Sequence, residues 1–446
     1  MLQTTKVHIK NNHHYSNILY NLCYHSARLY NVGLYSVRQH FFNTQKYLSY
    51  YDNYHECKSN ENYTLLLTDT GQQILRLVDR DMKSFFRLLT LKKSGKYSNP
   101  VHLPKYKDKE GLMTFAVQGR SVRLNKNQIR IGLTKEFKEL YNISIRYIDF
   151  TIPKHLQSVK QFNEVRVIPM YGGKEFSIEY IYDTKYLSSY KQIHGEGYMS
   201  IDIGVNNLMA CAVFSNGQFH QFLIDGKPLK NINAYYNKTI AHLKSQYSTN
   251  KTIKNPSTTK RMRRLYNGRS NRITDYFNKV VKLIIDKCFE YGVSHVVVGY
   301  NKGMKQKINM GVVNNQTIVS IPYHKLRSKL MNKCELHGIT YESQEESYTS
   351  KSSALDNDVI PVYGDDVTNV VFSGKRIHRG LYRSSEGILL NADINGSINI
   401  LRKYINERNE KWDFHDSVRA QVNVPCQKLK VFAQAPSIHS GFGRCS

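Results

Sequence analysis

The sequence predicts a multidomain α+β protein in which an N-terminal helical domain and a small β-barrel precede a C-terminal α/β domain. The chain has 446 residues, and single domains usually have ~100–200 residues, so we expect more than one core. The hydrophobic period also changes twice along the chain, from helical spacing to alternation and then to strands that alternate with helices.

Large apolar residues recur every three or four positions over 19–41 and again over 75–89, which indicates two amphipathic helices. Asp69 and Thr70 are suitable capping residues, and we expect the second helix to begin after them. The sequence therefore predicts a helical domain over 15–99.

The spacing of the hydrophobic residues changes to a period of two after residue 100. Val122 and Leu124 alternate before an Asn-Lys-Asn turn, and Ile129 and Ile131 alternate after it, which predicts a hairpin. Further alternation around a Gly172-Gly173 turn indicates a small antiparallel barrel. We assign 1–14 and 100–185 to this barrel and 186–197 to a linker.

The order of elements from residue 198 is strand, strand, strand, a long helical region, strand, helix, strand and a final helix. This order is that of an RNase H-like mixed sheet, and we assign 198–350 and 391–406 to it.

The charge of the chain favours a polyanionic partner. Lys and Arg outnumber Asp and Glu by 64 to 35, a formal charge of +29, and nucleic acid neutralises such an excess. We recognise no apolar membrane span, lipidation signal or signal peptide in the sequence. We therefore expect no membrane partner, and we expect a reducing intracellular compartment. The seven cysteines are scattered without zinc-site spacing, so no zinc is expected.

Two aspartates are candidate metal ligands. Asp202 interrupts the apolar strand of MSIDIGV, and Asp393 precedes the final helix in NADINGSINI. Each has an ordinary structural interpretation, a turn for Asp202 and a helix cap for Asp393. Phosphodiester cleavage with divalent metal needs carboxylates that converge from distant segments, with ions ~3.5–4 Å apart.

At these residues the chain resembles the TnpB family, the OrfB-type proteins encoded by transposons and related to type V CRISPR effectors. The similarity is strong over about 198–405, in the strings YMSIDIGVNNLMACAV, QEESYTSK, SGKRIHRGLYRSSEG and NADINGSINI. It is looser in the N-terminal half, in LYNVGLYSVRQHFF, DTGQQILRLVDRDMKSFFRLL and HLPKYK.

The resemblance implies an RNA-guided DNA endonuclease. Its helical domain would be the recognition domain, its barrel the wedge-type domain, and its C-terminal part a RuvC domain that cuts with Mg²⁺ or Mn²⁺, with two ions expected. The implied partners are a guide RNA and double-stranded target DNA with a short flanking motif, in the nucleoid-containing cytoplasm of a prokaryotic cell. Asp202 matches the first acid and Asp393 the third.

The second acid departs from the family pattern. Gly299 and Tyr300 stand where the fourth strand should end in Glu and Asp. Glu345 and Glu346 end the neighbouring strand, and because adjacent strand residues face opposite ways, only one can join the site. We favour Glu346 and leave Glu345 open. The alternative is a nuclease-dead, RNA-guided DNA-binding regulator; a strand-transfer transposase is less favoured because no nucleophilic Tyr or Ser motif stands out.

The family's zinc-binding cysteines are also missing, with Ser353 and Asp356 at the first pair's positions. We treat 351–390 as an insertion in place of the zinc-binding domain, with a basic hairpin, and 407–446 as a tail of open role. Candidate nucleic-acid contacts are basic residues that could equally be solvated surface charges. They are Lys375, Arg376, Arg379 and Arg383 of the hairpin, and Lys260, Arg261, Arg263, Arg264, Arg269 and Arg272, which we place just ahead of an apolar helix.

Overall fold

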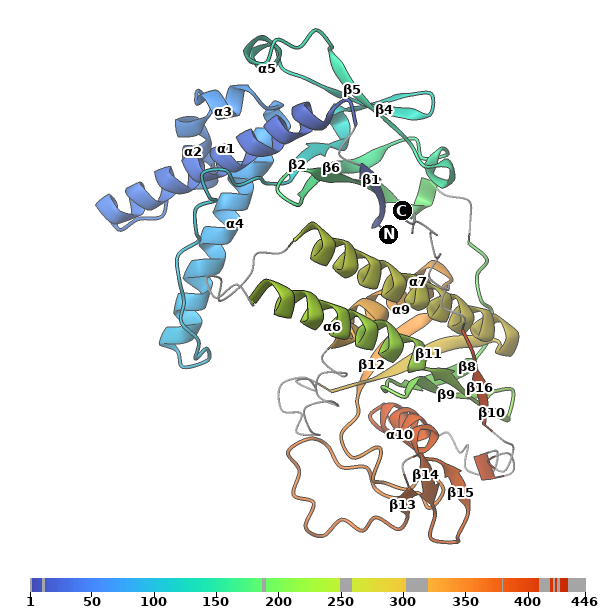
Figure 1. Ribbon diagram of the computed structural model, residues 1–446. Coiled ribbons are helices and arrows are strands. Elements are labelled where there is room, and N and C mark those ends of the chain that lie inside the picture. Colours follow the sequence, from blue (N-terminus) through green and yellow to red (C-terminus); the bar gives the residue numbers. More distant parts are fainter. Residues whose placement is uncertain are drawn as a thin grey trace. The chain divides into compact units, whose positions relative to one another are not determined.

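The computed structural model describes residues 2–9, 13–186, 190–248, 259–301, 320–378, 380–408, 418–419, 422 and 426–431 (Figure 1). The chain forms two compact units, Met1–Ser189 and Tyr190–Ser446. Each unit is described by itself below.

The N-terminal unit combines helices with two antiparallel sheets. Its helices are α1 (Ser16–Thr44), α2 (Tyr50–Cys57), α3 (Glu61–Thr64), α4 (Thr68–Lys93) and α5 (Lys135–Leu140), with 3₁₀ turns η1 (Gly119–Ser121), η2 (Lys154–Leu156) and η3 (Thr184–Tyr186). Its strands are β1 (Leu2–Ile9), β2 (Phe115–Gln118), β3 (Val122–Asn125), β4 (Gln128–Gly132), β5 (Tyr147–Thr151), β6 (Phe162–Met170) and β7 (Glu175–Asp183). The sheet orders are β1-β7-β6-β2 and β3-β4-β5.

Helices α1 and α4 pack closely because of one glycine. A Cβ at Gly33 would lie 2.6 Å from Leu75 Cδ2, so a larger residue there would push the helices apart. The start of α4 differs from the expectation: the helix begins at Thr68, and Asp69 accepts hydrogen bonds from Thr70 N and Gln118 N, which ties α4 to β2.

The C-terminal unit is built on a six-stranded mixed sheet of order β12-β11-β8-β9-β10-β16. These strands are β8 (Gly197–Asp202), β9 (Asn207–Ser215), β10 (Gln218–Asp225), β11 (Val293–Tyr300), β12 (Thr340–Glu345) and β16 (Gln427–Leu429). Strands β8, β9 and β10 are antiparallel, and β11 runs parallel to both β8 and β12. The predicted order of elements is therefore confirmed, and the chain has the expected multidomain α+β, RNase H-like architecture.

Helices cover both faces of this sheet (Figure 1). Helices α6 (Lys227–Ser248), α7 (Lys260–Tyr291) and α9 (Tyr323–Leu336) lie on one face, and α10 (Ala392–Asn406) lies on the other with the small sheet of β13 (Lys375–His378), β14 (Leu381–Arg383) and β15 (Leu389–Asn391). Strand β9 is buried on both sides: Met209 and Cys211 join the α7 core, and Ala210 and Ala212 join the α10 core.

Two features of this unit were not predicted from the sequence. The basic segment 260–272 does not precede the apolar helix but forms the first half of the same helix, α7. The tail 407–446, whose role the sequence leaves open, contributes an edge strand, because Gln427–Leu429 pairs in parallel with Phe222–Ile224 of β10. None of the helices that the structure describes is long and apolar enough to cross a bilayer.

Candidate active site

The parallel arrangement of β8, β11 and β12 brings their C-terminal ends to one edge of the sheet. Asp202 ends β8, Tyr300 ends β11 and Glu345 ends β12. The N-terminal half of α10 packs against β8 near the same edge, since Ser397 donates a hydrogen bond to the carbonyl of Ser200 at 2.8 Å. Residues from distant parts of the sequence thus meet at this edge.

Asp202 lies directly against α10. A Cβ at Gly396 would lie 2.9 Å from Asp202 Oδ2, so this glycine leaves room for the carboxylate between sheet and helix. Burial raises the pKa of Asp202 well above its usual range, the negative charges of Glu346 and Asp393 raise it further, and the charge of Arg376 opposes them. Asp202 is thus a half-buried carboxylate with two acidic neighbours.

Asp393 is held in the first turn of α10 by its surroundings. The side chain of Asn391 caps the helix by accepting from the amides of Asp393 and Ile394. The Asp393 carboxylate then accepts from Asn207 Nδ2 at 2.8 Å and from Arg376 at 3.1 Å. Thus Asn391, and not Asp393, supplies the side-chain cap, which leaves both Asp393 oxygens directed at Asn207 and Arg376.

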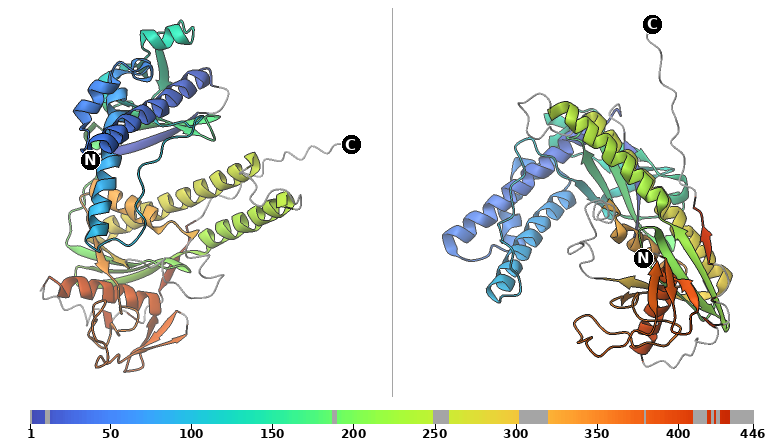
Figure 2. Two further views of the ribbon diagram at one scale, coloured as in Figure 1. Left: turned by 90° about the vertical axis from the view of Figure 1, so that its left-hand side faces the viewer. Right: turned by 60° about the horizontal axis from the view of Figure 1, so that its bottom comes forward.

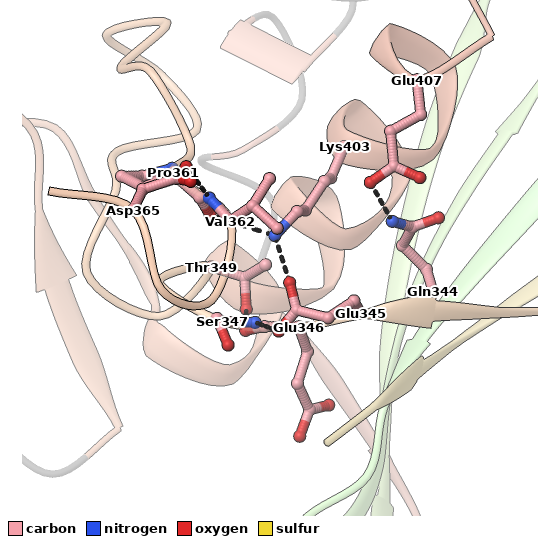
Figure 3. Close-up of polar contacts among 10 residues, drawn as sticks. All are labelled: Gln344, Glu345, Glu346, Ser347, Thr349, Pro361, Val362, Asp365, Lys403 and Glu407. Carbon is pink, nitrogen blue, oxygen red and sulfur yellow. Dashed lines mark hydrogen bonds and ion pairs between the residues drawn. The ribbon is translucent and has the colours of Figure 1, made fainter. Parts of the chain in front are cut away.

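The two glutamates have different surroundings (Figure 3). Glu345 forms an ion pair with the buried ammonium of Lys403 and accepts from the amide of Ser347 at 2.7 Å. Figure 3 shows the Glu346 side chain extending away from this network. Its Oε2 lies only 2.6 Å from where a Cβ of Gly299 would stand, so the glutamate fills the space that a larger residue at the end of β11 would need.

The local electrostatics disfavour the charge of Glu346. Burial raises its pKa; the charge of Arg327 opposes this rise, and that of Glu345 adds to it. Arg327 of α9 also donates to the carbonyl of Gly299, and its guanidinium lies 4.7 Å from the centre of the Tyr300 ring. Arg327 therefore links the end of β11 to the glutamate beside it.

Sequence reasoning missed the polar residues that orient these acids. Asn207 donates to Asp393, and its own carbonyl oxygen accepts from Lys428 Nζ at 3.1 Å, so a residue of the tail reaches the site through it. Lys403 and Arg327 were also missed. The sequence held a signal only for Lys403, which lies among apolar residues at the end of α10, because the other contacts depend on the fold.

The carboxylates are adjacent but not arranged as a finished metal site. Across the residues that the structure describes, no three His, Cys, Asp or Glu side chains are placed so that they could hold a metal ion. Arg376 now neutralises Asp393. The donors are nevertheless hard carboxylate oxygens of the kind that Mg²⁺ binds, and burial is the largest cause of the raised pKa of both Asp202 and Glu346.

The basic hairpin lies next to this site. The predicted hairpin forms, and its register places Lys375 directly opposite Arg383. Like charges opposite each other on neighbouring strands repel, so this pair suits a polyanion. Arg376 contacts Asp393, whereas Arg379 lies outside the described residues.

The other basic candidates lie along the first half of α7 on the opposite face of the sheet. Arg269 is anchored within the protein, since it donates to Asn233 and to the carbonyl of Ser320, both at 2.6 Å. The remaining candidates are exposed or half-buried: Lys260, Arg261, Arg263, Arg264 and Arg272. The structure therefore separates an anchoring arginine from the rest of the group.

The insertion 351–390 is held together by hydrogen-bonded carboxylates. Asp358 accepts from the amides of Ser353 and Ser373 at 2.6 and 3.0 Å and from the Ser373 hydroxyl at 2.6 Å. Asp356 accepts from the amide and hydroxyl of Ser385 at 2.9 and 2.7 Å. Hydrogen bonds to these two carboxylates thus join segments that are far apart in the insertion.

Comparisons with known proteins agree with this architecture. The "Probable transposase" family model (OrfB_IS605) matches residues 184–305, and the model of the Cas12f1-like TNB domain matches residues 323–400. The TnpB-like protein ORF457 of Acidianus two-tailed virus is 25% identical over 407 residues, which cover 85% of this chain and 82% of that protein.

The fold is also similar to that of a solved structure. The cryo-EM structure of a Cas12f1–sgRNA–target DNA complex contains a chain that superposes with a TM-score of 0.56 at 17% identity. The match covers 86% of this chain and 82% of that one. The likeness therefore extends over both units of the chain.

Proposed function

Because this chain belongs to the TnpB family, we propose that it is a guide-RNA-directed endonuclease that cuts DNA at one metal-dependent RuvC-type site. One observation carries the proposal: the Glu346 carboxylate fills the space beside Gly299. The negative charges of both Glu346 and Asp393 raise the pKa of Asp202, so the three acids are neighbours. A triad of acids is thus available although β11 does not end in an acid.

The assignment of roles follows from the contacts. Asp202, Glu346 and Asp393 would hold Mg²⁺ or Mn²⁺, and Glu345 is left to the ion pair with Lys403. When bound, the metal would activate water and stabilise the charge that develops on the phosphodiester. Asn207 orients Asp393, and Arg327 places a positive charge near Glu346. Arg376, which now holds Asp393, and the facing pair Lys375 and Arg383 would bind phosphates of the DNA strand.

The proposed partners are a guide RNA and double-stranded DNA with a short flanking motif. The charge of +29 supports a polyanionic partner, and the Cas12f1 chain with the similar fold was solved with sgRNA and target DNA. We further propose that the chain acts on DNA in the nucleoid-containing cytoplasm of a prokaryotic cell, since its TnpB-like relative is a protein of Acidianus two-tailed virus.

The test is plasmid cleavage with Mg²⁺ and the RNA that co-purifies with the chain, after that RNA has been sequenced. Asp202→Ala and Asp393→Ala should each lower cleavage by at least about 10³-fold, comparable to the loss of other essential catalytic groups. Both should keep wild-type RNA affinity, because the basic surfaces are unchanged. The matched control is Glu342→Ala, a change on β12 that removes only the exposed ion pair of Glu342 with Arg408. This variant should cut normally.

Two outcomes would contradict the proposal. Cleavage that survives Asp202→Ala or Asp393→Ala would show that these acids are not the ligands. Guided DNA binding by the unmutated chain without any cleavage would instead identify an RNA-guided regulator.

A further inference from the structure

A cavity of about 290 Å³ lies between α6 and α7 and has no role in the site described above. The two helices run side by side in both figures of the whole chain (Figures 1 and 2). The cavity has an apolar wall formed by Ile232 and Leu265 and two tyrosines, Tyr235 and Tyr236. Tyr235 is 59% exposed, although it lines the cavity.

Gly268 is in the interior of α7, where glycine is the least favourable residue after proline. A glycine in a helix is usually explained by a close neighbour, as Gly33 is by Leu75. At Gly268, however, a Cβ would meet nothing within 4 Å. The glycine is therefore not needed for packing in this structure, and it leaves the cavity open to a ligand.

The charge around the cavity is unbalanced. The sequence from Gly226 to Thr274 contains no Asp or Glu. Within the described residues, Arg261, Arg264 and Arg272 line the cavity without a hydrogen-bond or ion-pair partner. Arg269 is the exception, since its bonds to Asn233 and Ser320 hold it 5.1 Å from the centre of the Tyr236 ring. The free guanidinium groups are thus available for anionic groups of a ligand.

A planar group with phosphates on either side fits these features. Aromatic rings and arginine side chains stack on unpaired bases, and arginines bind the adjoining phosphates. The volume lies at the lower end of the range for small-ligand pockets, about 300 Å³, which favours a single base over a longer segment. We therefore infer that the cavity between α6 and α7 binds one unstacked nucleobase of the guide RNA.

The position of the cavity favours the guide over the strand being cut. Helices α6 and α7 cover one face of the sheet, whereas α10, which carries Asp393, and the basic hairpin cover the other. A DNA strand whose phosphodiester lies at the carboxylates would therefore lie on a different side of the sheet from the cavity. This assignment rests on the proposed function in that the RNA is taken to be the guide.

The test fills the cavity without removing any charge. Gly268→Leu introduces a side chain into the open space, and Gly268→Ala is the matched control, because it makes the same change in backbone freedom with little added volume. Both residues are better helix formers than glycine, so neither variant should unfold α7. The probes are the labelled RNA that co-purifies with the chain and a DNA oligonucleotide of the same sequence.

We expect Gly268→Leu to weaken RNA binding by about 10-fold, the effect of losing one stacked base, while Gly268→Ala stays within about 2-fold of the wild type. Binding of the DNA oligonucleotide should change less. Chemical probing of the RNA complex should show one base that is protected in the wild type and in Gly268→Ala but reactive in Gly268→Leu.

A second variant tests the phosphates. Arg264→Gln should lower the slope of log affinity against log salt by about 0.7, the value for one contact to a single strand. Lys282→Gln is the control on the same helix, because Lys282 is already paired with Asp286 at 2.8 Å. Its slope should equal that of the wild type.

Each contrary outcome points to a different error. Wild-type RNA affinity in Gly268→Leu, with guided cleavage intact, would overturn the cavity assignment and leave the proposed function standing. Equal losses for RNA and DNA would overturn the assignment to the guide. Failure of the unmutated chain to bind RNA would overturn the proposed function itself.

Discussion

Glu345 and Glu346 are adjacent in sequence, yet the structure gives them separate tasks. Glu345→Ala should leave cleavage within about 3-fold of the wild type but destabilise the fold by about 1–3 kcal/mol, because the ammonium of Lys403, only 4% exposed, keeps the carbonyl of Pro361 but loses its carboxylate partner. Glu346→Ala should abolish cleavage with little loss of stability, since it removes a half-buried carboxylate whose pKa is raised. Plasmid cleavage and thermal melting, measured on both variants, separate the two roles.

The opposite result is informative. If Glu345→Ala stopped cleavage while Glu346→Ala still cut, the relocated ligand would be Glu345, and Lys403 would have to release it. Glu345→Gln serves as the control for Glu345→Ala, because its amide can still accept from the Lys403 ammonium.

The choice between the glutamates shows where residue-level prediction from sequence stops. Alternation along a strand predicts that only one of the pair faces the site, but β12 ends at Glu345, so the rule does not extend to Glu346. The deciding partner is Lys403, which is 58 residues further along the chain. Asp202 and Asp393 were easier to select, because an acid in an apolar strand and an acid before an apolar helix are visible locally.

At the scale of elements, the insertion 351–390 can be tested by chelation and by acid. Burial raises the pKa of Asp356, but hydrogen bonds from Ser353 and Ser385 outweigh it and hold the pKa below its usual value. A carboxylate with a lowered pKa stabilises the fold above its unfolded-state pKa of about 3.9, and this contribution is lost as the pH falls through the folded-state pKa.

We therefore expect a chelator at neutral pH to leave the hydrogen-exchange protection factors of 351–390 unchanged, whereas pH values below about 4 should lower these protection factors. Asp356→Ala should destabilise the insertion by about 1–3 kcal/mol at neutral pH, and the variant should then lose less additional stability in acid than the wild type. Faster exchange on chelation alone would show that the segment depends on a metal after all.

Prediction of the elements succeeded where a hydrophobic period was clear. Strands β8 to β12 were recognisable because their apolar residues are continuous or alternate. Strand β16 was not, because Gln427–Leu429 has three residues and is selected by the open edge of β10. A long helical region was predicted, but the continuity of the basic segment 260–272 with the apolar helix was missed, since charged residues hide the spacing of Met262 and Leu265.

At the scale of the whole molecule, the charge of +29 makes stability and binding respond to salt in opposite directions. Like charges repel within the folded chain, and salt screens this repulsion, so the chain without nucleic acid should become more stable as salt is added. Binding of RNA releases counterions, so its affinity falls as salt rises. Because a ligand stabilises the fold according to its affinity, the extra stability of the complex should fall as well.

Melting curves in a sodium chloride series should therefore converge. The Tm of the chain alone should rise with salt, and the Tm of its complex with the co-purifying RNA should fall towards it. The reason is that a protein with about 6–10 phosphate contacts loses about 10³–10⁵-fold in affinity between about 50 and 200 mM salt. The complex of Arg264→Gln should converge at lower salt than the wild type, since it begins with a weaker complex. A Tm that rises in parallel for chain and complex would show that the excess charge does not mediate RNA binding, and the guide would then have to be held by uncharged contacts.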